Sequence, residues 1–158
     1  MFREIRRIKN KISEEECKRL LKENKRGSFS VNGDDGYPFS IPINFYYCEE
    51  DNRIYFHSAK SGHKIDSINR DNKVCFTTWD DGYKVEGDWA YYVSCCVVFG
   101  KATLITDPDL TLKRIREFAL KYYPTEEEVD EEIKQSIKNV QLVAINIEHI
   151  SGKKIHEK

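Results

Sequence analysis

The sequence has no long apolar run, and this absence excludes a protein that crosses a membrane on helices. Of its 158 residues, 39% are hydrophobic and 34% are charged, and no stretch approaches the roughly 20 apolar residues that a spanning helix needs. The first residues, Met-Phe-Arg-Glu-Ile-Arg-Arg, carry charge but no following apolar segment, so we expect no secretory signal peptide. The length, without any internal repeat or low-complexity linker, predicts a single domain over residues 1–158.

The sequence also lacks an excess of positive charge. Its formal net charge is −1, whereas domains that bind nucleic acid usually carry a strongly basic patch. We therefore expect no nucleic-acid partner and no binding of nucleic acid through an aromatic-rich barrel face.

The five cysteines lack the spacing of a metal site or a disulfide framework. None forms a Cys-x-x-Cys pair and their number is odd, which leaves zinc binding and paired disulfides poorly supported. The pattern favours a reducing cytoplasm, in which most thiols pack as small apolar groups. Adjacent Cys95 and Cys96 would point to opposite faces of a strand, where packing is favoured over a redox role.

No Walker loop is present, yet residues 54–69 have features of a different phosphate site. Residues 54–56 predict a strand, and Ser61 is the predicted N-cap of a short helix that follows it. The first turn of that helix would contain Gly62, His63 and Lys64. Free backbone N–H groups, the helix dipole and the lysine charge would all favour an anion there. The alternative is an ordinary strand–turn–helix with a solvated lysine.

Helix signals occur near both ends of the chain. Two Ser/Thr-x-x-Glu capping boxes, Ser13–Glu16 and Thr125–Glu128, each predict a helix start. Gly27 is the expected end of the first helix. A further helix is predicted to begin at residues 107–109 and to be broken by Pro124.

Alternating apolar and polar residues predict about six strands. They are expected near residues 29–31, 37–47, 54–56, 74–78, 91–105 and 143–147. Pro38 and Pro42 remove ladder donors, so residues 37–47 are expected at a sheet edge, at a bulge or facing a ligand. Gly100 is a predicted bulge. In the last strand, Val143, Ile145 and Ile147 should share one face. Only one short helix interrupts these strands, which favours a small closed or split barrel over a doubly wound sheet.

Five blocks of the sequence together resemble a known family. They are Tyr37–Phe45, Ile54–Ala59, Gly62–Asp66, Asn72–Phe76 and Ser94–Ala102. These blocks resemble the flavin-binding split barrels of the pyridoxamine 5′-phosphate oxidase-like superfamily, and within it the nitroimidazole-resistance (Nim) proteins. The Phe-His-Ser-Ala…Gly-His-Lys-Ile-Asp block is the most specific part, and the likeness runs over nearly the whole chain. It implies a mainly β fold with flanking helices: a six-stranded antiparallel Greek-key split β-barrel that binds FMN.

The resemblance also implies an assembly and a site. It implies a homodimer with FMN in two clefts at the subunit interface, the FMN phosphate lying where Ser58, His63 and Lys64 converge. The implied cofactor-binding residues are Ile41, Pro42, Ile43, Asn44, Phe56, His57, Ser58, Ala59, His63, Lys64 and Ser94. His57 would lie close to the flavin as the catalytic residue, or would instead be a hydrogen-bonded structural histidine. Trp79 and Trp89 would roof the partner's flavin or simply pack.

One departure from the oxidases themselves concerns the substrate. Those enzymes carry arginines for the FMN phosphate and the substrate, whereas residues 38–45 contain none. This argues against pyridoxamine phosphate as the substrate.

Two functions follow as hypotheses. The first is an FMN-dependent oxidoreductase that passes electrons from a reduced donor, such as a nicotinamide, to a small acceptor, such as a nitro compound. The second is a non-catalytic split barrel that holds flavin, haem or another planar ligand for storage or sensing.

Overall fold

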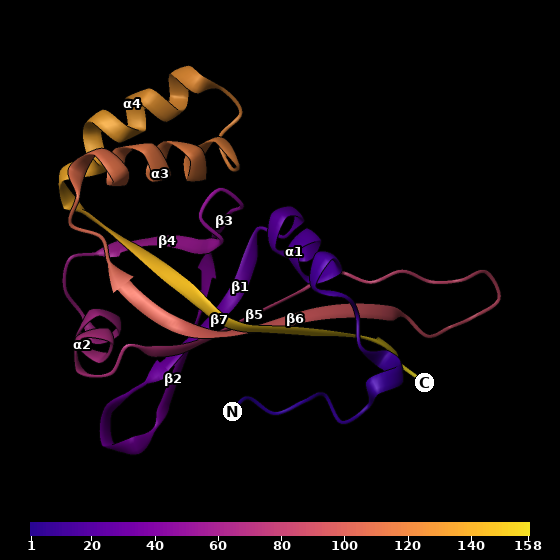
Figure 1. The fold of residues 1–158 in the computed structure, drawn as a ribbon. Helices are drawn as coiled ribbons and strands as arrows, with labels where there is room; N and C mark the ends of the chain where they lie inside the picture. Colours follow the sequence, from indigo (N-terminus) through magenta and orange to yellow (C-terminus); the bar gives the residue numbers. More distant parts are fainter.

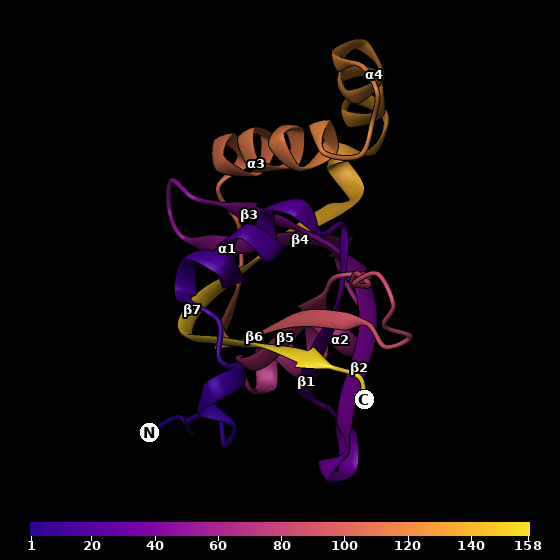
Figure 2. The same ribbon diagram turned by 90° about the vertical axis from the view of Figure 1, so that its right-hand side faces the viewer.

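Seven antiparallel strands form one strongly curled sheet in the computed structural model, which describes all 158 residues (Figure 1). The strands are β1 (Arg26–Asn32), β2 (Pro38–Asn44), β3 (Tyr46–Cys48), β4 (Arg53–Ala59), β5 (Lys73–Trp79), β6 (Tyr92–Leu104) and β7 (Val140–His156). Their order across the sheet is β2-β1-β5-β6-β7-β4-β3. Strands β2 and β3 lie at the two ends of this order, yet only Phe45 separates them along the chain. The two edges of the sheet therefore meet, which gives the barrel seen in Figure 2.

Phe45 explains why seven strands are present where six were predicted. The expected single strand over residues 37–47 divides at Phe45. The Phe45 ring is buried in the core, and its backbone groups form hydrogen bonds outside the sheet. Its N–H donates to the Tyr122 hydroxyl at 2.9 Å, and its carbonyl accepts from the Lys121 ammonium at 3.1 Å. Both partners come from the end of a helix far along the chain. Strand β2 does lie at the sheet edge, as Pro38 and Pro42 predicted.

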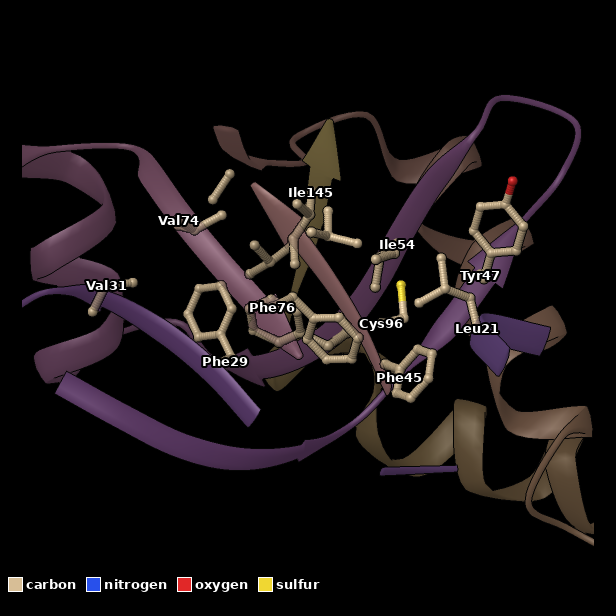
Figure 3. Close-up of a cluster of buried hydrophobic side chains, with 14 of the residues drawn as sticks. Leu21, Phe29, Val31, Phe45, Tyr47, Ile54, Val74, Phe76, Cys96 and Ile145 are labelled. Carbon is tan, nitrogen blue, oxygen red and sulfur yellow. The ribbon is translucent and has the colours of Figure 1, made fainter. Parts of the chain in front are cut away.

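Aromatic rings fill the inside of the barrel (Figure 3). Phe29 packs on Phe56, and Phe45 on Phe76, each pair with ring centroids 4.7 Å apart. All four rings are almost fully buried. Burying one such side chain contributes about 1.5–3 kcal/mol, so this cluster is a main source of the barrel's stability.

Four helices flank the barrel: α1 (Glu14–Glu23), α2 (His63–Arg70), α3 (Pro108–Leu120) and α4 (Glu126–Ser136). Short 3₁₀ turns occupy Ile8–Asn10, Asp34–Gly36 and Ile137–Asn139. The Ser13 hydroxyl accepts from the Glu16 N–H at 3.1 Å, and the Thr125 hydroxyl accepts from the Glu128 N–H at 3.3 Å. Both predicted capping boxes are thus confirmed. No helix combines the length and the apolar character that crossing a membrane requires.

Gly27 does not end α1, contrary to the sequence prediction. The helix stops at Glu23, and Gly27 lies within β1. A side chain there would meet the Phe76 ring at 2.3 Å, so glycine is needed for close packing in the strand rather than for a helix end. The bulge expected at Gly100 is confirmed by a register shift between Phe99 and Gly100 against β7.

Strand β7 keeps the predicted alternation, and both of its faces are covered over residues 142–145. Val143 and Ile145 face the barrel core, as predicted, with Ile147 partly buried against it. Leu142 and Ala144 point the other way but are also fully buried, in a second apolar cluster with Ile115 of α3. Helices α3 and α4 lie together above this part of the sheet (Figure 1).

Candidate cofactor site

Helix α2 begins without a side-chain cap. Its N-cap is Gly62, with φ of 123° and no side-chain hydrogen bond, so the prediction that Ser61 caps this helix is wrong. The backbone angle at Gly62 is one that residues with a Cβ rarely adopt. A Cβ built at this position would have no neighbour within 4 Å. No side chain therefore caps the first-turn backbone N–H groups, and the space beside Gly62 is open.

Lys64 lies in this uncapped turn with no carboxylate partner. Its ammonium forms no ion pair and lies 5.6 Å from the centre of the Phe56 ring. Burial alone lowers the pKa of Lys64. A partly desolvated cation beside free N–H groups is an arrangement that an anion would stabilise.

His57, near the end of β4, is electrostatically linked to the same lysine. His57 is exposed over much of its surface, yet partial burial of its ring and, after it, the Lys64 charge lower the pKa of His57, so the imidazole is mainly neutral at pH 7. Its ring packs edge-on against Phe118 of α3, with centroids 5.1 Å apart. The contact with Phe118 could not be read from the sequence, where this residue only contributes to a helical apolar stripe.

His63 connects the start of α2 to the β1–β2 hairpin. Its ring stacks on Phe39 of β2 at 4.2 Å, and its Nε2 lies 3.5 Å from an Asp34 carboxylate oxygen. Arg70 also donates to Asp34, at 2.9 Å. These contacts fix the uncapped turn beside strand β2, and they place the Asp34 carboxylate next to His63, a residue predicted to contact the phosphate.

A cavity of about 690 Å³ borders the predicted ring-binding strand. Ile41 and Pro42 of β2 line it together with Trp79, which is 56% exposed. Ile41 and Ile43 are half-buried against the core, whereas Pro42 and Asn44 are exposed on the opposite face of β2. Phe39, the contact of His63, is only two residues from Ile41, roughly 7 Å along a strand. The cavity and the α2 turn are therefore neighbours along β2.

Four other residues that were predicted to bind the cofactor differ in their exposure. Phe56 is fully buried in the core, so only its backbone is available. Ser58 is half-buried and Ala59 exposed at the end of β4. Ser94 is only 2% exposed; its N–H donates to an Asp80 carboxylate oxygen at 2.9 Å, and Asp80 lines the cavity.

Comparison with protein families gives a match over nearly the whole chain. The family model described as pyridoxamine 5′-phosphate oxidase matches residues 13–154. The chain belongs to this family. The resemblance read from the sequence is confirmed, and no curated protein matches the chain.

Solved structures with similar folds agree with this assignment. A candidate 5-nitroimidazole antibiotic resistance protein from Bacteroides thetaiotaomicron is 20% identical, with a TM-score of 0.75 over 92% of this chain and 87% of that one. The conserved protein Rv2991 from Mycobacterium tuberculosis is 17% identical, with a TM-score of 0.79 over 95% and 90%. An FAD-binding protein from Mycobacterium smegmatis is 21% identical, with a TM-score of 0.64 over 92% and 98%. All three share the fold of this family member.

The predicted residues thus fall into three groups. The end of β4 and the start of α2 bring together Phe56, His57, Ser58, Ala59, His63 and Lys64. Residues 41–44 form the adjacent part of β2, with two of them at the cavity. Ser94 lies apart from both, behind Asp80.

Proposed function

We propose that this protein is an FMN-dependent oxidoreductase of the nitroimidazole-resistance type. The observation that carries the proposal is the uncapped first turn of α2, where Lys64 has no counter-ion and His57 is close by. Its family membership supports the proposal, and the FAD named for the similar M. smegmatis protein supports a flavin as the cofactor class.

The donors present fit a flavin phosphate. A phosphate is a dianion that favours free backbone N–H groups at a helix start and a lysine charge. Gly62 leaves the approach open, and Ser58 adds a hydroxyl near the same turn. FMN is proposed over riboflavin because riboflavin has no phosphate to accept hydrogen bonds from these groups or to pair with the Lys64 charge.

The isoalloxazine ring is proposed to lie along β2 beside the 690 Å³ cavity. Ile41, Pro42 and Trp79 supply the apolar contacts in a lining that is otherwise polar or charged. Bound FMN would supply the redox chemistry. The protein would hold the ring, exclude water from one side of it, and present the His57 imidazole, which is mainly neutral at pH 7 and can donate or accept one hydrogen bond.

We propose that the protein acts as a homodimer. Ser28, Thr77 and Val97 are aligned across β1, β5 and β6 on the outer face of the sheet, opposite the core. They are small and half-buried, and helices α1 and α2 pack on the other side of the sheet. The cavity opens on this face, since Ser28 and Pro42 line it. A second copy would cover the face and close the cavity.

The proposed partners are a reduced nicotinamide as electron donor and a small acceptor. A nitro compound is proposed because of the likeness to the B. thetaiotaomicron protein. Pyridoxamine phosphate is disfavoured because residues 38–45 carry no arginine.

The test begins with the visible spectrum of the purified protein after incubation with FMN and gel filtration. We expect a flavin spectrum on a species with the mass of a dimer, and oxidation of NADH or NADPH that depends on a nitro compound. His57→Ala should change turnover or the flavin spectrum with the fold intact. Flavin retained without turnover under any of these conditions would instead support the binding module. A protein that retains no flavin would contradict both.

A further inference from the structure

A second group of cations without partners lies at the opposite end of the molecule from α4. Although the net charge of the chain is −1, its two ends are strongly basic where they meet. The cations are Arg6, Arg7, Lys9, Lys11, Lys153 and Lys154, and none of them forms an ion pair. Helix α4, by contrast, contains six acidic residues among its eleven. The chain therefore separates its charges, with the termini at one end and α4 at the other (Figure 1).

The basic N-terminal segment is held in place. The Ile12 N–H donates to the Gly152 carbonyl at 3.0 Å, and Lys11 forms a β-bridge with Lys153. A side chain at Gly152 would lie 2.8 Å from Ile12 and 2.6 Å from the Cys17 sulfur, so the segment packs closely on β7. The like charges are thus kept together by backbone pairing, although their mutual repulsion opposes it.

These two segments enclose a cavity of about 550 Å³. Arg7, Lys9, Lys11 and Lys154 line it, together with Tyr92 and His156. Two neighbouring carboxylates are already engaged: Asp88 with His156 at 2.8 Å, and Glu16 with Arg19. No ion pair within the chain therefore neutralises the four cations that line the cavity.

An aromatic wall stands beside these cations. The Tyr92 ring stacks almost parallel with His156 at 4.3 Å and with Tyr83 at 5.3 Å. Tyr83 is half-exposed, and the Lys154 ammonium lies 5.8 Å from its ring centre. Planar rings next to unpaired cations suit a ligand that has both a flat base and phosphate groups.

We propose that this cavity binds a nucleotide, with its phosphates on Arg7, Lys9, Lys11 and Lys154 and its base against Tyr92 and His156, the aromatic residues that line it. A single nucleotide fits better than a nucleic-acid strand, because the cations surround one cavity rather than following an extended groove. None of these residues belongs to the candidate cofactor site, so the proposal does not depend on the proposed function.

The test is calorimetric titration of the full-length protein with ADP, pyrophosphate and adenosine, with FMN present at saturation to occupy the other site. We expect ADP to bind, pyrophosphate to compete with it, and adenosine to bind at least tenfold more weakly. Higher salt should weaken ADP binding. An absence of ADP binding, or equal binding of adenosine, would overturn the proposal.

Three variants locate the binding. Lys154→Gln and Arg7→Gln should each weaken ADP binding about tenfold, in the range for a hydrogen bond to a charged group. Tyr92→Ala should weaken the binding of ADP but not that of pyrophosphate. The matched control is Lys138→Gln, at an exposed lysine beside α4 that forms no ion pair. This variant should leave the affinities for ADP and pyrophosphate unchanged.

The same loss of ADP affinity in Lys138→Gln would show a nonspecific polyanion surface and overturn the nucleotide site. Tighter binding of a single-stranded RNA oligomer than of ADP would do the same. Circular dichroism melting checks that each variant is folded.

Discussion

Arg114 and Lys64 are both cations withdrawn from solvent, but only Arg114 has its charge matched. The Arg114 side chain is 4% exposed and binds Glu50, Asp51 and Glu117 at 2.8–3.2 Å, which fixes α3 to the β3–β4 turn. Lys64 is half-buried and has no carboxylate. The contacts of Arg114 within the fold account for its burial. The burial of Lys64 without a carboxylate is accounted for by an anionic ligand that would bind there. The helix starts show the same contrast, since α1, α3 and α4 have side-chain caps and α2 has none.

The largest effect on stability is expected at Arg114. Arg114→Met should lower the free energy of unfolding by about 3 kcal/mol, because it leaves the Asp51 and Glu117 carboxylates without their partner. Lys64→Met should change it by less than about 0.5 kcal/mol, since it keeps the apolar stem and removes a charge that burial disfavours. Urea unfolding of both variants measures the difference. Equal destabilisation by the two substitutions would contradict the view that Arg114 stabilises the fold and Lys64 does not.

Removing a structural helix cap should have a smaller effect. Ser13→Ala should lower the free energy of unfolding by about 1 kcal/mol, the usual contribution of an N-cap, and should leave FMN affinity unchanged. Ser61→Ala is the matched control, because Ser61 caps nothing in the structure, and it should leave stability unchanged. A clear loss in Ser61→Ala would mean that α2 is capped after all.

The smallest effect is a pH dependence at His57. Because the folded protein holds the pKa of His57 below its ordinary value, the unfolded chain binds the proton first as pH falls below about 6.5. Stability from this group is therefore lost as pH falls through that range. His57→Gln should flatten the dependence between pH 7 and pH 5, measured by urea unfolding. An identical pH profile in the variant would show that His57 is not desolvated.

Local signals in the sequence predicted much of this fold. The two capping boxes, the bulge at Gly100 and the edge position of β2 each depend on residues close together in the chain, and each is confirmed. That the end of β4 and the start of α2 form one cofactor site came from the family blocks, and it stays a prediction.

The errors share a physical cause, which is contact with distant segments. The division of the strand at Phe45 depends on Tyr122 and Lys121 at the end of α3. Gly27 was assigned to a helix end because its close neighbour, Phe76, is known only from the folded sheet.

The most direct test of the account is to titrate the wild type and Lys64→Met with both FMN and riboflavin. If the α2 turn binds the phosphate, the variant should lose about 1.5–3 kcal/mol of FMN binding, the range for a hydrogen bond to a charged group, or roughly tenfold to hundredfold in affinity. Riboflavin has no phosphate, and its affinity should stay the same. An equal loss for both flavins would place the damage in the ring pocket or the fold, and would contradict the assignment of Lys64 to the phosphate.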